Sequence, residues 1–183
     1  MALAALSGDE QCVIFVQLCN VLDPGFAVSF GSASSELWTA TQAPRQQLQA
    51  DHEAATALGR KAGVRSCKEL RETKSVWWCQ HAFADGPLSS DDLAFLGKLG
   101  SVLPALEELV LQERAAGPDG VQRLAEKLGA GALPAVILLH LNDTPVGDAG
   151  AEALAAALGR GALPRLKILD LSYAAIGDAG LVA

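Results

Sequence analysis

The sequence has few cysteines, few positive charges and no long hydrophobic run. Four Cys among 183 residues, without close and even spacing, do not make a disulfide framework. The 14 Lys and Arg are outnumbered by 21 Asp and Glu, which gives a net charge of −7. An acidic chain is repelled by phosphate, so nucleic acids and anionic membrane surfaces are poor candidates for partners.

Signals for membrane insertion or secretion are also missing. No apolar run approaches the roughly 20 residues that span a bilayer. The first ten residues lack the basic stretch of a secretion signal. We therefore expect a cytoplasmic or nuclear protein with no membrane insertion.

What the sequence does contain is a repeat in its second half. A Leu-Pro pair recurs every 30 residues, at Leu103-Pro104, Leu133-Pro134 and Leu163-Pro164. An apolar triplet follows each pair at constant spacing, and two glycines three residues apart come next. The first two copies are identical at 13 of 30 positions, which identifies an internal repeat.

Each copy predicts one strand and one helix. Leu109 and Leu111 alternate, so they point to one face of a short strand. Leu124 and Leu128 form one stripe of a helix, and Gly129 suits a left-handed C-cap. Such a unit cannot bury its apolar faces alone, whereas stacked units can, with their strands parallel along one side.

The pattern L-x-x-L-x-L…G-x-x-x-L-x-x-x-L, at residues 106–128 and 136–158, resembles leucine-rich repeats of the ribonuclease-inhibitor-like class. The resemblance implies an α/β solenoid with parallel strands on the concave side and helices on the convex side. In that family an Asn side chain satisfies backbone groups between coils. The matching positions hold Arg114, Thr144 and Ala174, and only Thr144 could partly replace the Asn.

We expect the repeats to occupy residues 76–183. A degenerate copy at 76–102 precedes copies at 103–132 and 133–162 and a shortened copy at 163–183. The degenerate copy is aligned by placing Cys79 thirty residues before Leu109, and its helix is expected at 91–99 behind an N-cap at Ser89. The open C-terminal end would be covered by further repeats or by a neighbouring molecule.

Residues 1–75 carry no such repeat and predict helices. Residues 9–22 place apolar side chains on one broad helical face, which Asp23-Pro24-Gly25 would end. Further helical stretches are expected at residues 27–38 and 44–61, and a capping box at residues 66–69 opens a short helix. We therefore expect a helical module at 1–44 and a helical connector at 45–75.

Part of this region resembles an F-box. The resemblance is carried by Leu6, Glu10, Ile14-Phe15, Leu18, Leu22-Asp23-Pro24 and Trp38. It implies an all-α hook that docks on the Skp-type adaptor of cullin-RING ubiquitin ligases, through Leu6, Ile14, Phe15, Leu18, Leu22 and Pro24. No Lys or Arg occurs before Arg45, so long-range attraction to that acidic adaptor would be absent. The other interpretation is a helical cap over the first repeat.

Stacked strands would place their outward residues in columns on the concave sheet, the usual binding surface of this architecture. The predicted columns are Trp78, Glu108, Leu138 and Ile168; then Gln80, Val110, His140 and Asp170; then Ala82, Gln112, Asn142 and Ser172. They mix apolar, amide and acidic groups, which suits a protein partner. Of Trp77 and Trp78, we expect one ring to pack inside and the other to reach the concave rim.

No catalytic, cofactor or metal site is expected. His140 and Asp170 would be neighbours, as in a hydrolytic triad, but no G-x-S-x-G elbow accompanies them. We interpret the pair as an ordinary cross-strand contact. The Cys and His residues show no C-x-x-C or H-x-x-x-H spacing.

The sequence therefore predicts a non-enzymatic protein-interaction module without cofactors. In the leading hypothesis it is the substrate-recognition subunit of a cullin-RING ubiquitin ligase, with the client on the concave face. The alternative is a structural or accessory subunit that uses the repeat arc as a scaffold in a larger assembly.

Overall fold

A computed structural model of the chain describes residues 6–79, 86–112, 116 and 118–181. The chain divides into two compact units, Met1–Thr56 and Ala57–Ala183. The first is helical, whereas the second combines helices with a parallel sheet. The division falls inside one long helix, α4 (Gln42–Lys61).

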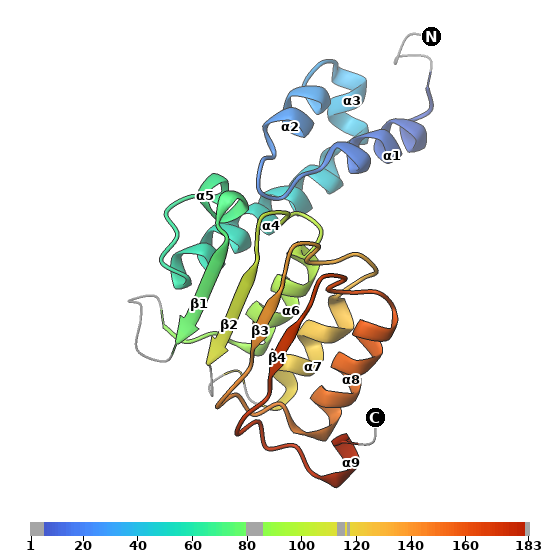
Figure 1. Ribbon diagram of the computed structural model, residues 1–183. Coiled ribbons are helices and arrows are strands. Elements are labelled where there is room, and N and C mark those ends of the chain that lie inside the picture. Colours follow the sequence, from blue (N-terminus) through green and yellow to red (C-terminus); the bar gives the residue numbers. More distant parts are fainter. Residues whose placement is uncertain (1–5, 80–85, 113–115, 117, 182–183) are drawn as a thin grey trace. The chain divides into compact units, whose positions relative to one another are not determined.

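The first unit contains α1 (Gly8–Leu18), α2 (Gly25–Gly31), α3 (Ser35–Ala40) and most of α4 (Figure 1). Ser7 and Glu10 form a capping box at the start of α1. The stretch predicted at 27–38 is two helices, because the Ser34 hydroxyl accepts the N–H of Leu37 and starts α3. The helix predicted at 9–22 ends at Leu18, since Asn20 bonds locally and competes with the helix.

A small hydrophobic core holds this first unit together. Its buried members are Phe15 from α1, Ala27 from α2 and Leu48 from α4. Four partly buried side chains pack against them: Leu18, Cys19, Val21 and Phe30. Helices α1, α2 and α4 therefore share one dry interior.

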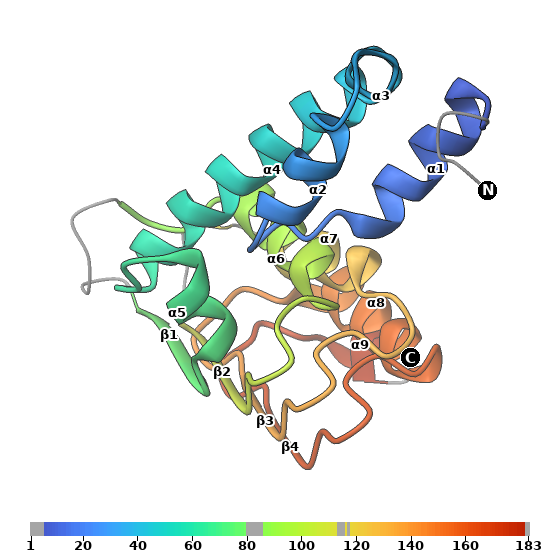
Figure 2. The same ribbon diagram turned by 90° about the horizontal axis from the view of Figure 1, so that it is seen from above.

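The second unit is built from alternating strands and helices. It contains α5 (Cys67–Glu72), β1 (Ser75–Cys79), α6 (Ser90–Leu99), β2 (Glu108–Gln112), α7 (Pro118–Lys127), β3 (Leu138–His140), α8 (Gly147–Gly159), β4 (Ile168–Asp170) and α9 (Asp178–Leu181). The four strands form one parallel sheet in the order β1-β2-β3-β4. Both views show α6, α7 and α8 side by side along one face of this sheet (Figure 1, Figure 2).

The strands pair as the repeat predicts for β2, β3 and β4, but not for β1. Leu109 pairs with Leu139 and Leu139 with Leu169, a spacing of 30 residues. On the β1 side of β2, Leu109 pairs with Val76, a spacing of 33 residues. The prediction that Cys79 aligns with Leu109 is therefore wrong. A shift by an odd number of residues turns every side chain of a strand to the opposite face. Trp78 is consequently in the core, 2% exposed, and not on the outer face where it was predicted.

Successive coils share one interior. Leu109, Leu111, Leu139 and Leu141 are at most 1% exposed, which confirms the predicted parallel stacking of apolar strands. In the last coil, Leu169 and Leu171 are only partly buried. The leucines of the last strand therefore have less cover than their equivalents in the preceding coils.

The turns of successive coils repeat their backbone conformation. Gly131 and Gly161 adopt φ of 72° and 86° after α7 and α8, whereas Gly129, the predicted left-handed cap, does not. Two buried leucines, Leu133 and Leu163, follow with φ of 51° and 49°. After the strands, Asp143 and Tyr173 both adopt a φ of 58°.

A buried hydroxyl joins two coils at a position that the sequence singled out. Thr144 is 0% exposed, and its Oγ1 donates a hydrogen bond to the carbonyl of Leu111 in the coil before. Thr144 therefore satisfies a backbone carbonyl of the neighbouring coil, which is part of the role expected of the Asn in leucine-rich repeats. Further along, the Asp148 carboxylate accepts the N–H of Gly177 at 2.7 Å, a link between coils that the repeat pattern did not reveal.

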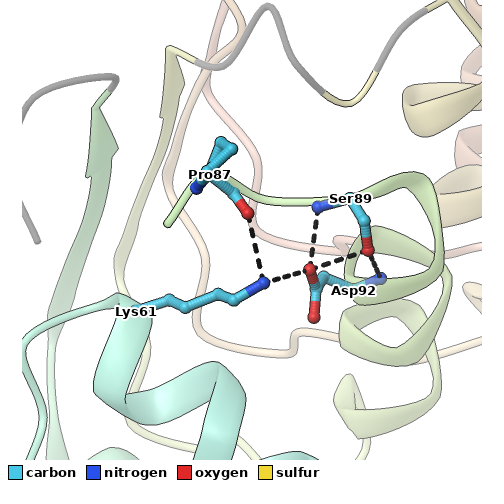
Figure 3. A network of polar contacts seen from close by, with 4 residues as sticks. All are labelled: Lys61, Pro87, Ser89 and Asp92. Atoms are coloured by element: carbon cyan, nitrogen blue, oxygen red, sulfur yellow. Dashed lines mark hydrogen bonds and ion pairs between the residues drawn. The ribbon is translucent and has the colours of Figure 1, made fainter. Parts of the chain in front are cut away.

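A charged network holds the start of α6 (Figure 3). Ser89 is the N-cap predicted there, and it forms a capping box with Asp92. The Lys61 ammonium donates to Asp92 Oδ2 at 2.7 Å and to the carbonyl of Pro87 at 3.1 Å. Burial by itself raises the pKa of Asp92, but the hydrogen bonds from Lys61 and Ser89 outweigh burial and leave that pKa below its ordinary value.

Candidate protein-binding surface

The sheet face opposite the helices carries the side chains that alternate with the buried leucines. We call it the outer sheet face and define it by the outward residues of the four strands: Ser75, Trp77, Glu108, Val110, Gln112, Leu138, His140, Ile168 and Asp170. The register places them in two main rows across the strands. One row is Ser75, Glu108, Leu138 and Ile168, and the other is Trp77, Val110, His140 and Asp170.

An indole is held at the β1 edge of this face. Trp77 is 56% exposed, and its Nε1–H donates to Ser75 Oγ at 2.5 Å. Ser75 Oγ in turn donates to Glu108 Oε2 at 2.8 Å. This chain of bonds fixes a large amphipathic ring beside a carboxylate, and exposed Trp side chains are enriched among the anchors of protein interfaces.

A second polar group lies across β3 and β4. His140 Nδ1 is 3.5 Å from Asp170 Oδ2, which places the predicted pair side by side. Asp170 Oδ1 also accepts the hydroxyl of Ser172 at 2.6 Å and its backbone N–H at 2.9 Å. These Ser172 bonds, with a smaller contribution from His140, lower the pKa of Asp170, so the carboxylate is the stable form at neutral pH.

Apolar side chains lie beside both polar groups, in β2, β3 and β4. Val110 is 6% exposed, Leu138 is half-buried, and Ile168 is 51% exposed. The face therefore offers an aromatic ring and aliphatic side chains flanked by carboxylates, on a backbone that the parallel ladder keeps rigid. Protein interfaces likewise combine aromatic and apolar side chains with polar groups.

The other predicted members of the columns lie at or beyond the ends of the strands. Gln112 is the last residue of β2, and Asn142 and Ser172 follow β3 and β4. Gln80 and Ala82 fall outside the described residues. Ser75 and Trp77 were not predicted on this face, although Trp77 could have been found by testing a repeat length other than 30 against the two adjacent tryptophans.

The residues predicted to dock an adaptor differ in exposure. The side chains of Phe15 and Leu22 are only 0% and 4% exposed, so they pack in the interior of the first unit and do not reach its surface. Leu6, Ile14, Leu18 and Pro24 are partly exposed. Large apolar side chains stand further out at Val13, Val16, Phe26, Val28 and Trp38, which are 44–68% exposed.

Comparison with known families identifies part of the second unit. Residues 138–155 and 163–183 match the family model described as Leucine Rich repeat. The chain carries two leucine-rich repeats. They contain β3 with most of α8, and β4 with α9, and together with the parallel sheet they fit an α/β repeat fold. Leucine-rich repeats generally mediate protein–protein interaction, and the family is typically non-enzymatic.

The other comparisons and searches gave no match. No curated protein and no solved structure was found to match the chain. Among the described residues, no group of three or more His, Cys, Asp or Glu could hold a metal ion. Across the same part of the chain, none of the helices has the length and apolar character needed to cross a membrane.

Proposed function

We propose that the chain is a protein-binding module whose outer sheet face docks a protein partner. The observation that carries this proposal is the exposed pair Trp77 and Ile168, which stand at opposite edges of one rigid sheet with carboxylates beside them. The two leucine-rich repeats support it, because stacked repeats expose an extended sheet surface that binds proteins.

Quantitative capture of partners with matched variants tests the proposal. Trp77→Arg and Ile168→Arg each place a charge at the apolar part of the outer sheet face. Ala155→Arg adds the same charge to an exposed position on α8. We expect mass spectrometry to show proteins that wild type and Ala155→Arg retain and both outer-face variants lose. Identical capture by all four proteins would contradict the proposal.

A second proposal concerns the first unit, which we infer to be an F-box-like module. The supporting observations are the short helices α1–α3 around Phe15 and the partly exposed Leu6, Ile14 and Leu18 on or beside α1. In this proposal the module docks a Skp-type adaptor and the outer sheet face takes a client, as in a substrate-recognition subunit of a cullin-RING ubiquitin ligase. The chemistry of ubiquitin transfer would belong to other subunits.

Titration of the purified chain with a Skp-type adaptor tests this second proposal. Because Phe15 is fully buried, Phe15→Glu would unfold the unit, so the informative variant is Ile14→Glu at a partly exposed position. Gln17→Glu adds the same charge at an exposed position of α1 and is the control. We expect binding that Ile14→Glu removes and Gln17→Glu retains. No binding of wild type at tens of micromolar would contradict the proposal.

The partly exposed leucines of the last strand favour an alternative, a scaffold subunit in a larger assembly. Leu166, Leu169 and Leu171 are less covered than Val136, Leu139 and Leu141, and a neighbouring molecule or further repeats would cover them. Size-exclusion chromatography with light scattering tests this alternative. Self-association that Leu171→Glu reverses would support it, and a monomer at all concentrations would count against it.

A further inference from the structure

The first unit contains a cleft of about 420 Å³ that the sequence did not predict. One wall is a stripe of α4 formed by Gln42, Arg45, Gln46, Gln49 and His52. Their spacing of three and four residues places these side chains on the same face of the helix. The volume lies within the range of protein sites that bind ligands.

The rest of the lining is apolar and partly open to solvent. Val28 of α2 is 44% exposed and Trp38 of α3 is 54% exposed, and Pro24 lines the cleft beside them. Leu48 of α4 also lines the cleft and is buried, because it belongs to the core of the unit. An apolar side chain that entered here would remove Val28 and Trp38 from water.

Arg45 supplies a positive charge whose position is fixed. Its guanidinium lies 3.4 Å from the centre of the Trp38 ring. Its Nη2 donates to the carbonyl of Trp38 at 2.6 Å and its Nε to that of Thr41 at 3.4 Å. A guanidinium has five N–H donors, so three remain to bind a carboxylate.

The charge of the surrounding unit makes this cation unusual. Residues 1–56 contain six Asp and Glu, and Arg45 is the one Lys or Arg among them. None of the six carboxylates lines the cleft. Arg45 therefore places the positive charge of the unit at the apolar cleft, and the Glu53 carboxylate lies outside the lining, where it accepts a bond from the Gln49 amide at 3.1 Å.

The imidazole ring of His52 lies at one end of the α4 stripe and adds a further polar side chain to the lining of the cleft. Its Nδ1 lies 2.7 Å from the carbonyl of Val21, and because a carbonyl only accepts, Nδ1 carries the hydrogen. Between Gln42 and His52 the helix rises by about 15 Å. That length matches about ten residues of a docked helix or four to five residues of an extended chain.

We propose that this cleft binds an acidic amphipathic peptide segment of a partner protein. Apolar side chains of the segment pack against Val28 and Trp38, and a carboxylate binds the Arg45 guanidinium. Gln42 and Gln46 offer amide groups to the backbone of the segment. Charge complementarity selects this occupant, because a basic segment would meet Arg45 and find no carboxylate in the lining.

Selection from a random library, followed by titration, tests the proposal. A phage-displayed library of random 12-residue peptides is selected on the full chain. The recovered peptides are synthesised with a fluorophore and titrated by fluorescence anisotropy. The variants are Arg45→Gln, which removes the cation, and Val28→Glu, which places a carboxylate at an exposed position of the cleft. Arg65→Gln removes an equal charge from an exposed position outside the cleft and is the control.

We expect recovered peptides that combine Asp or Glu with aromatic or aliphatic residues. Their affinity should fall at least about tenfold in both cleft variants and stay within about twofold of wild type in Arg65→Gln. Circular dichroism checks the fold of each variant. If Arg45→Gln unfolds, the exposed Val28→Glu substitution decides the question.

Three results would overturn the proposal. The selection could yield no peptide, or peptides that are basic or uncharged. Acidic peptides could bind both cleft variants as tightly as wild type. Finally, the peptides could keep their affinity in the cleft variants and lose it in Trp77→Ala, which would assign them to the outer sheet face.

Discussion

Truncation of equivalent leucines in neighbouring strands measures how strongly the repeats cover each other. Leu139 in β3 and Leu169 in β4 are paired residues, thirty positions apart, with the same expected role. Leu139 is 1% exposed, with a strand on either side. Leu169 is half-buried and lies in the edge strand. The perturbation is Leu→Ala at each position.

The magnitude follows from the cover of each side chain. A leucine enclosed on all sides loses both its transfer free energy and the contacts around the cavity left behind, so Leu139→Ala should cost about 3–5 kcal/mol. A half-buried leucine loses only part of its transfer free energy and leaves an open notch, so Leu169→Ala should cost about 1–2 kcal/mol. The first value is a large share of the about 5–15 kcal/mol that stabilises a typical domain.

Urea unfolding followed by tryptophan fluorescence measures both values. The chain has three Trp, and Trp78 is the one buried in the second unit. A background with Trp38→Phe and Trp77→Phe leaves Trp78 as the single reporter of that unit. The difference in free energy of unfolding is then read from two curves with the same probe.

Two outcomes would refute the reasoning. A cost below about 1 kcal/mol for Leu139→Ala would show that the coils do not share a packed interior. Equal costs for both substitutions would show that β4 is covered as fully as β3.

Four further substitutions give distinct expectations. Trp78→Ala should cost about 3–5 kcal/mol in urea unfolding and Trp77→Ala less than about 1 kcal/mol, and the reverse order would disprove the 33-residue register. Because the pKa of Asp92 is lowered in the folded state, its bond to Lys61 stabilises above the unfolded pKa near 4 and is lost as pH falls through the folded value. Asp92→Asn should therefore cost about 1 kcal/mol at pH 7, with the gap to wild type closing toward about pH 2, and a gap independent of pH would contradict this. Gly97→Ala would place a methyl group 2.6 Å from a backbone carbonyl oxygen of α7, so its melting temperature should drop by several degrees, and an unchanged temperature would contradict this packing.

Much of the repeat architecture was predictable, because buried leucines must return whenever a coil meets its neighbour. Leu109 and Leu139 mark the strands, and Ser89 with Asp92 marks the start of α6. The register of β1 was not predictable from a fixed repeat length, since the first coil is three residues longer. Trp77 and Trp78 are chemically identical, so their order gives no sign of which one faces outward.

The cleft of the first unit could not be predicted from a sequence pattern. Val28 and Arg45 belong to different helices, and no motif links residues that meet only through tertiary packing. The outer sheet face was predictable as a surface, because alternation along a strand fixes which residues point outward. Which residues of β1 belong to this face depended on the register of β1 against β2, so Ser75 and Trp77 were not predicted there.

The left-handed turns have a consequence for anyone who redesigns this chain. Asp143 and Tyr173 share no chemistry, yet both adopt a φ of 58°, a conformation that asparagine and glycine tolerate best. The shared position after β3 and β4, and not the preference of the local amino acid, goes with this geometry. A consensus array built from these coils could therefore place Asn or Gly at every such corner and gain stability without altering a single buried leucine.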